Sequence, residues 1–136
     1  MTFNLRVSAD TNGFVLPITD GTIKKMGAKL TDSEGRLLLK LARQSIEQGL
    51  GKKTDIKRTG VDASRILLDE SRGTFVSLHK KGELRGCIGN IEPVKTIFES
   101  VSDNAGHAAF NDSRFPPLRI EELGDVQIEV SILTRP

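Results

Sequence analysis

The first strong pattern along the chain is that of an amphipathic helix. Thr31 and Glu34 have the spacing of a capping box, in which two side chains bind backbone N–H groups at a helix start. Apolar residues within 37–46 then recur at helical spacing on one broad face, and Gly49 and Gly51 supply the end signal. The opposite face carries charged residues, which are Arg36, Lys40, Arg43 and Glu47.

A second helix is predicted after Pro93, because proline is tolerated in the first turn of a helix. Its apolar stripe is narrow, with spacings of three and four residues, and consists of Val94, Ile97, Val101, Ala105 and Ala108. Small residues within 105–109 would let this helix approach a sheet closely. Polar residues and two prolines within 111–117 end the helix.

Alternating apolar and polar residues predict strands elsewhere. Residues 3–8 and 13–18 form two short extended segments separated by turn-forming residues, which is typical of a hairpin. Residues 73–79 and 84–91 predict a second hairpin around a tight turn that contains a glycine. Residues 126–133 alternate without interruption, as in a half-buried strand. One side of that strand carries Val126, Ile128, Val130 and Ile132.

The order of these elements decides the fold class. Two strands and a helix are followed by residues 52–72, which show no sustained period and predict a long loop. Two more strands, a helix and a last strand complete the chain. This order lacks the regular βαβ alternation of a doubly wound sheet. The sequence therefore predicts an α+β fold with a mainly antiparallel sheet and two principal helices.

Composition indicates one globular domain. The chain has 136 residues, of which 37% are hydrophobic and 28% charged, as expected for a protein with a single core. Its longest aliphatic run, 37–39, is far shorter than the ~18 residues that a membrane helix needs. The single cysteine excludes an internal disulfide, and the N-terminus has no targeting pattern. We therefore expect a cytoplasmic protein without membrane contact.

Charge is unevenly distributed, although the net charge is only +2. Residues 24–60 contain ten Lys or Arg and four Asp or Glu, whereas residues 61–136 contain nine and twelve. A basic segment of this kind is compatible with a polyanionic partner such as RNA. A solvated helix face with its adjoining loop explains the same residues and is favoured, so RNA binding stays an alternative.

The segment Leu84–Gly89, LRGCIG, concentrates the candidate chemistry. In an extended strand Arg85 and Cys87 point to the same face, where the guanidinium would stabilise a reactive thiolate. Gly86 and Gly89 weaken a strand, so they indicate the close approach of another group and are candidate ligand contacts. A free cysteine is more often a small core residue, and the sequence places no base beside this one. Thiol chemistry and packing both stay open.

Three further residues are candidates for the same site. Arg114 lies in a loop with two prolines; held near Arg85 it would complete a site for a carboxylate or phosphate, and otherwise it fastens its own loop by pairing with Asp112. Glu129, on the last strand, is the natural counter-ion of Arg85 if the two are buried together. His107 is a candidate catalytic residue that Asp103 would orient from one helical turn away, although an ordinary exposed pair explains both residues and is favoured.

These segments, in this order, resemble the AMMECR domain family. The family hallmark is LRGCIG, and the match also includes GTFVSL at 73–78, AAFNDSRFPPL at 108–118 and EVSIL at 129–133. The resemblance covers residues 31–134. It divides the chain into an N-terminal extension, 1–30, which we expect to join the sheet as a hairpin, and an AMMECR-like domain, 31–136.

The resemblance implies a fold and a kinship more than an activity. Prokaryotic relatives often accompany a radical-SAM protein and a Memo-like protein, which implies a modification pathway. Family members commonly have proline where Ser113 stands. They also usually continue beyond the last matched strand into a segment with a Leu-Pro motif, which we expect to be missing here. Residues 13–17 are faintly similar to that segment, so a rearranged order is conceivable.

The sequence supports several hypotheses for function and does not decide whether the protein is an enzyme. The first is a small binding module for an anionic ligand, RNA or a protein partner, with contacts from Arg85, Gly86, Gly89, Arg114 and Glu129. The alternative is a thiol-dependent enzyme, or a component of a radical-SAM-associated pathway, with the catalytic residues Cys87, Arg85 and His107. No metal or cofactor is predicted, because the one cysteine and two histidines have no recognisable zinc spacing.

Overall fold

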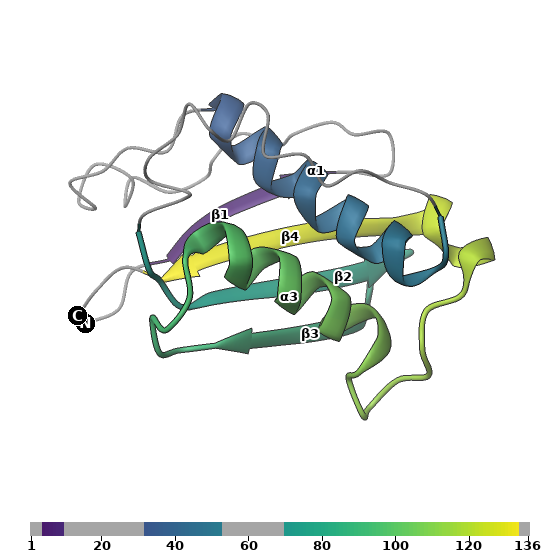
Figure 1. Cartoon of the computed structure of the whole chain (residues 1–136). Helices are drawn as coiled ribbons and strands as arrows, with labels where there is room; N and C mark the ends of the chain where they lie inside the picture. Colours follow the sequence, from purple (N-terminus) through teal and green to yellow (C-terminus); the bar gives the residue numbers. More distant parts are fainter. Residues whose placement is uncertain (1–3, 10–31, 53–69, 134–136) are drawn as a thin grey trace.

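The computed structural model describes residues 4–9, 32–52 and 70–133 of the chain. Four antiparallel strands form one sheet in the order β1-β4-β2-β3, and two long helices lie on one of its faces (Figure 1). The strands are β1 (Asn4–Ala9), β2 (Thr74–Lys80), β3 (Glu83–Asn90) and β4 (Val126–Leu133). The helices are α1 (Asp32–Gly49), α3 (Ile97–Phe110) and a short 3₁₀ helix, η2 (Ile120–Asp125). The predicted α+β class is therefore confirmed.

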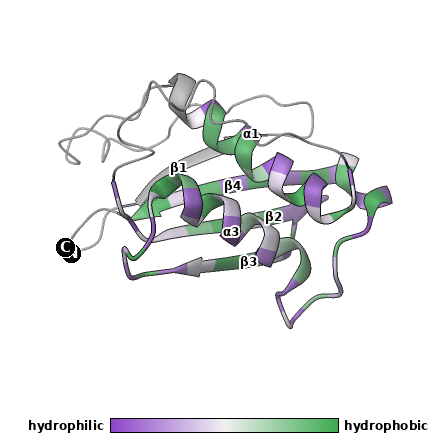
Figure 2. Cartoon of the chain, viewed as in Figure 1, coloured by the Kyte–Doolittle hydropathy of each residue, from purple (hydrophilic) through white to green (hydrophobic). Residues whose placement is uncertain are grey.

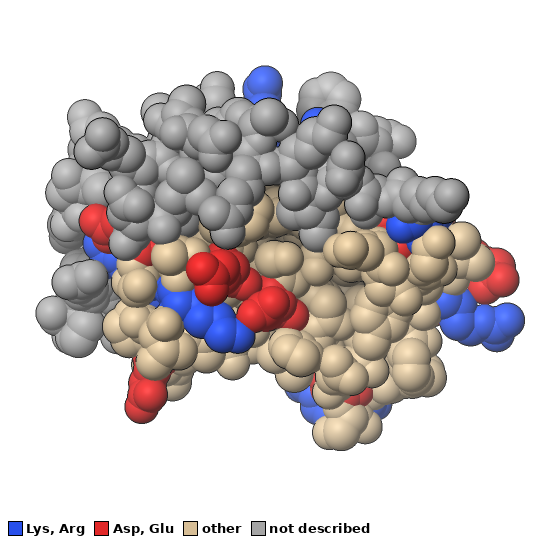
Figure 3. All heavy atoms as spheres, viewed as in Figure 1, with Lys and Arg blue, Asp and Glu red and all other residues tan. Residues whose placement is uncertain are grey.

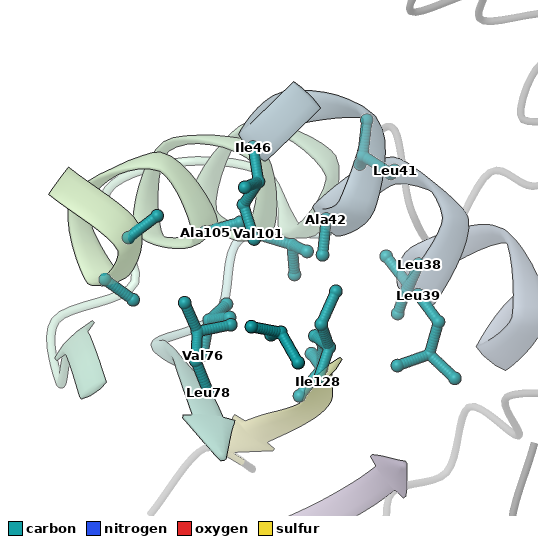
Figure 4. Close-up of a cluster of buried hydrophobic side chains, with 14 of the residues drawn as sticks. Leu38, Leu39, Leu41, Ala42, Ile46, Val76, Leu78, Val101, Ala105 and Ile128 are labelled. Carbon is teal, nitrogen blue, oxygen red and sulfur yellow. The ribbon is translucent and has the colours of Figure 1, made fainter. Parts of the chain in front are cut away.

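The core lies between the sheet and the two long helices. The four residues predicted to form the apolar side of β4 are each at most 2% exposed. Apolar and polar stretches alternate along α1 (Figure 2), and the apolar side chains of both helices point toward the sheet (Figure 4). The buried side chains shown there include Leu38, Ala42, Ile46, Val76, Leu78, Val101, Ala105 and Ile128.

The hairpin of β2 and β3 was predicted correctly, but it contains an irregularity that the sequence did not reveal. Its turn is Lys81-Gly82, and both residues have positive φ angles, 52° and 79°, as a two-residue hairpin turn requires. The register shifts between Leu78, which pairs with Gly86, and His79, which pairs with Leu84. Arg85 is therefore the extra residue of a β-bulge.

The start of the second long helix differs from the prediction. The N-cap of α3 is Thr96, whose side-chain oxygen accepts a hydrogen bond from the Glu99 backbone N–H at 3.2 Å. Pro93 and Val94 precede the helix, and Val94 is 71% exposed instead of belonging to the apolar stripe. The Thr96 to Glu99 spacing matches the capping signature that marked the first helix, and it outweighs the proline signal.

Several sequence expectations fall partly or wholly outside the described residues. The expected strand at 3–8 is present as β1, which pairs with β4, whereas its predicted partner at 13–18 is not among the described residues. The same holds for the helix cap at Thr31 and for most of the predicted loop, 53–69. No helix within the described part of the chain is long and apolar enough to cross a membrane.

Arg43 departs from its predicted place on the solvated face of α1. Its guanidinium donates hydrogen bonds to the carbonyl oxygens of Leu123 at 3.3 Å and Val126 at 2.9 Å. Burial lowers the pKa of Arg43, and the nearby Glu47 carboxylate partly offsets that effect. The long side chain reaches from α1 to the end of η2, so Arg43 fastens the segment that leads into β4.

Candidate functional site

The candidate site is built around the edge of the sheet at β3. Among the described strands its single neighbour is β2, so every second residue directs its backbone N–H and C=O away from the sheet. At Cys87 the outward N–H donates to Asp112 Oδ2 at 3.0 Å. The Asp112 side chain is only 4% exposed. The loop that follows α3 therefore covers the strand edge at the centre of the LRGCIG motif.

Asp112 also holds Arg114. Its Oδ1 accepts from Arg114 Nε at 3.0 Å and its Oδ2 from Arg114 Nη2 at 2.8 Å. Arg114 Nη2 makes a further contact with the Cys87 carbonyl oxygen at 3.4 Å. These bonds hold the pKa of Asp112 well below its usual range, first because of the Arg114 guanidinium and then because of the Cys87 N–H. Asp112 and Arg114, which the sequence allowed to pair within their own loop, thus also connect that loop to β3.

The Arg114 guanidinium nevertheless faces solvent. Its side chain is 57% exposed, and its guanidinium carbon lies 5.3 Å from the centre of the Phe115 ring. The hydrogen bond to Asp112 is the main cause that raises the pKa of Arg114, and an electrostatic interaction with Cys87 is a smaller cause. The cation next to the thiol is therefore Arg114, whereas the sequence had suggested Arg85.

The Cys87 side chain lies on the face of the sheet opposite the helices. It pairs with Ser77, and Ser77 in turn pairs with Glu129, so the three residues form one row across β3, β2 and β4. Ser77 Oγ donates a hydrogen bond to Cys87 Sγ at 3.2 Å. All three residues are half-buried. Both long helices lie on the other face (Figure 1), and no described helix covers this row.

His79 is a site residue that sequence reasoning missed. It stands two residues after Ser77 on β2, and the residues between and before them, Val76 and Leu78, are fully buried in the core. His79 and Ser77 therefore share the face that carries Cys87. The alternation of the GTFVSLH segment already places His79 on the face of Ser77, and the pairing of Ser77 with Cys87 adds the thiol to the same face.

His107 lies elsewhere. It is exposed on α3, on the helix-covered side of the sheet, and its Nδ1 accepts a hydrogen bond from the Asn111 side-chain amide at 2.8 Å. Asp103, the partner expected from the helical spacing, is paired with Lys95 instead. The structure therefore does not bring His107 together with Cys87. The expected Asp103–His107 pair is wrong.

Arg85 also occupies an unexpected place. Its Nε and Nη2 donate to the two oxygens of Glu122, each at 3.0 Å, and Lys80 Nζ donates to Glu122 Oε1 at 3.1 Å. Lys80 pairs with Val126, a core residue, so this cluster lies at the helix-covered face. The expectation that Arg85 and Cys87 share one face is wrong, because the bulge turns Arg85 to the other side.

The counter-ion of Arg85 is thus Glu122, not Glu129 as the sequence suggested. Glu122 is fixed on η2 by accepting the Arg119 backbone N–H at 2.9 Å. A glutamate three residues into a helix is a recognisable capping signal, but this 3₁₀ helix was not predicted. Arg85 Nη1 is buried and has no hydrogen-bond partner among the described residues. An unpaired buried N–H of this kind costs ~1–3 kcal/mol.

Close contacts at the two glycines of the motif leave no room for a larger residue at either position. A Cβ on Gly86 would lie 2.1 Å from the Ala108 carbonyl oxygen of α3, and a Cβ on Gly89 would lie 2.2 Å from the Phe75 ring. The predicted close approach is confirmed at both positions. The approaching groups belong to the chain itself, so ligand contact by Gly86 and Gly89 stays a prediction.

The described part of the chain contains no group of three or more His, Cys, Asp or Glu side chains that could hold a metal ion. The site offers three side-chain types for chemistry: an exposed guanidinium, a thiol, and an imidazole on the same face of the sheet as the thiol. These come from the α3–η2 loop, β3 and β2 respectively.

Comparison with known proteins decides the family. The sequence model of AMMECR1 matches residues 39–136. The chain belongs to the AMMECR1 family. A protein of Methanothermobacter thermautotrophicus is 45% identical over 109 residues, which are 80% of this chain and 56% of that protein. A protein of Methanopyrus kandleri is 46% identical over 116 residues, which are 82% and 54% of the two chains.

A solved structure agrees with the fold. The crystal structure of an uncharacterized protein from Pyrococcus horikoshii has a TM-score of 0.61 and 35% sequence identity, and the match covers 70% of this chain and 48% of that one. This chain spans about half the length of these relatives. The names of these relatives state no activity, so the function of the AMMECR1 site has to be argued from its geometry.

Lowering the pH should destabilise this AMMECR1 chain through Glu122. The Arg85 hydrogen bond is the main cause that lowers the pKa of Glu122 from 4.5 to about 2. A carboxylate with a depressed pKa contributes stability that is complete above its unfolded-state pKa and is lost as the pH falls through the folded-state value. We expect the free energy of unfolding, measured by urea denaturation, to fall less between pH 4.5 and about 2 in Glu122→Gln than in the wild type.

The matched control is Glu121→Gln, because Glu121 is a neighbour on η2 whose side chain is 68% exposed. Its pH profile should follow that of the wild type. Identical pH slopes in Glu122→Gln and the wild type would show that the Arg85–Glu122 pair contributes no pH-dependent stability.

Proposed function

We propose that this AMMECR1 chain is a binding module for a small anionic ligand, which Arg114 holds beside Cys87. The observation that carries the proposal is the contrast between Arg114 and its partner. The Arg114 side chain is 57% exposed, yet its orientation is set by a carboxylate that is 4% exposed. A surface arginine normally samples many rotamers, whereas this one is held by two hydrogen bonds to Asp112.

Such an arrangement favours binding because the side-chain entropy has already been lost before the ligand arrives. Asp112 occupies the Nε and Nη2 positions of Arg114, and no described residue accepts a hydrogen bond from Nη1. Nη1 therefore remains available for an oxygen of a carboxylate or phosphate. The Phe115 ring below the guanidinium supports its plane.

The described surface gives less support to RNA as the ligand. Arg43, one of the basic residues on which that alternative depended, is bound to backbone carbonyl oxygens instead of facing solvent. On the face shown in Figure 3, acidic and basic side chains lie close together, and the described residues there form no continuous basic patch. A small anion, which needs one positioned guanidinium, fits these residues better than a polyanion.

Removal of the Arg114 guanidinium should abolish most of this binding. We expect inorganic phosphate, titrated into ¹⁵N-labelled protein, to shift the Cys87 amide resonance in the wild type. Arg114→Gln should weaken the apparent affinity by about tenfold or more, because one charge-assisted hydrogen bond contributes ~1.5–3 kcal/mol.

Arg119→Gln is the control for this titration, because Arg119 is 78% exposed and pairs with Glu121 on the surface. It should bind phosphate like the wild type. If both variants lost the same affinity for phosphate, the loss would come from the overall charge of the protein, and the proposal would be rejected. A shift only on addition of oligoribonucleotide, and strongly reduced by salt, would favour RNA.

A second candidate function is thiol chemistry at Cys87, and the position of His79 favours it. The sequence offered no base for this cysteine, but His79 is on the same face of the sheet, two residues from the serine that contacts the sulfur. An imidazole in that position can accept the thiol proton, which is the usual way to activate a cysteine nucleophile. This candidate replaces His107 by His79 and Arg85 by Arg114.

Alkylation with iodoacetamide tests the second candidate. Cys87 sulfur forms a thioether with the reagent, iodide leaves, and the thiol proton passes to His79. We expect His79→Asn to slow this reaction severalfold at neutral pH, since the base is lost, and His107→Asn to leave the rate unchanged. Equal rates in the wild type and His79→Asn, with both proteins shown to be folded by circular dichroism, would reject the role of His79.

A further inference from the structure

We infer that Lys80, Arg85 and Glu122 form a second anion site, separate from Arg114, that binds a small monoanionic carboxylate. The three side chains meet at the helix-covered face near the end of the β2–β3 hairpin. Both cations donate to the same oxygen, Glu122 Oε1, at 3.1 Å from Lys80 and 3.0 Å from Arg85. Arg85 is 11% exposed, Glu122 17% and Lys80 31%.

The geometry of the Arg85 guanidinium supports this inference. Glu122 occupies the edge formed by Nε and Nη2 of Arg85. A guanidinium has five N–H donors in a fixed planar arrangement, so a second edge, formed by Nη1 and the other hydrogen of Nη2, remains. Nη1 is buried, and no residue in the described part of the chain accepts a hydrogen bond from it. This second edge has the spacing that two oxygens of a carboxylate match.

The net charge of the three side chains also favours a monoanionic ligand. Lys80 and Arg85 are cationic and Glu122 is anionic, so these three side chains have a net charge of one positive unit. A site that is largely removed from water favours a ligand that neutralises it. A carboxylate contributes one negative charge and completes the balance. A dianion such as sulfate would leave one uncompensated negative charge among buried groups, so it should bind more weakly.

The residues of this second site are also held in place, on η2 by Arg43 and on β3 by the bulge. Arg43 fastens η2 through the Leu123 and Val126 carbonyl oxygens, which fixes the segment that carries Glu122. The bulge in β3 fixes Arg85. Lys80, the most exposed member, keeps two N–H groups beyond its bond to Glu122. Because Nη1 is buried, the side chains around it have to move before a ligand reaches it.

An NMR titration of the full chain with sodium formate tests this inference. The signal to follow is the Arg85 Nε–Hε resonance, with sodium sulfate and sodium chloride at matched ionic strength as comparisons. We expect a saturable shift with formate and an apparent affinity for sulfate that is lower by about tenfold or more. Equal responses to formate, sulfate and chloride would overturn the inference, as would the absence of any saturable response.

Variants separate the contributions of charge and shape. Lys80→Met removes one positive charge and should weaken formate binding by about tenfold or more, whereas Lys81→Met, in the adjoining turn, should bind like the wild type. Arg85→Lys keeps the charge and loses the planar edge, so it too should lose formate binding, followed in this variant at the Glu122 backbone amide resonance. Unchanged binding in Lys80→Met would contradict the inference. Because the phosphate titration at Arg114 follows the Cys87 resonance, either site can fail without the other.

Discussion

The buried carboxylate of Asp112 is the interaction on which the candidate site depends. An edge strand leaves backbone groups without partners, and these groups would otherwise meet solvent or another chain. Asp112 accepts the Cys87 N–H, and Arg114 reaches the Cys87 carbonyl oxygen. The same carboxylate orients the Arg114 guanidinium. One side chain thus protects the strand edge, attaches a proline-containing loop to it and positions the exposed cation that we propose as the ligand-binding group.

The β-bulge at Arg85 is the second constraint, because it divides the LRGCIG motif between two environments. Arg85 turns toward Glu122 and Lys80 on the helix-covered face, while Cys87 stays with Ser77 on the face opposite the two long helices. Gly86 lets α3 approach closely. A motif that looks like one cluster in sequence is therefore two sites in space. Anion binding at Arg85 and thiol chemistry at Cys87 would therefore use different sides of one strand, whereas Arg114 lies beside Cys87.

More of the fold than of the candidate site could be predicted from the sequence. Alternation and capping patterns are local, so they placed β4 and the β2–β3 hairpin closely and identified both long helices. The bulge depends on register between strands, which no local pattern records, and it made the predicted partnership of Arg85 and Cys87 wrong. Glu122 was missed because it lies in a short 3₁₀ helix between segments. Asp112 was read as a local partner of Arg114, whereas its contact with β3 is tertiary.

Hydrogen exchange at the Cys87 amide tests the central role of Asp112 most directly. In the wild type this amide donates to a carboxylate that is 4% exposed, so slow exchange is expected. In Asp112→Ala we expect the Cys87 amide to exchange at least about tenfold faster, because an N–H at the strand edge without an acceptor is exposed to solvent. The amides of Val76 and Val130 should keep their protection. Equal protection of Cys87 in both proteins would contradict the account.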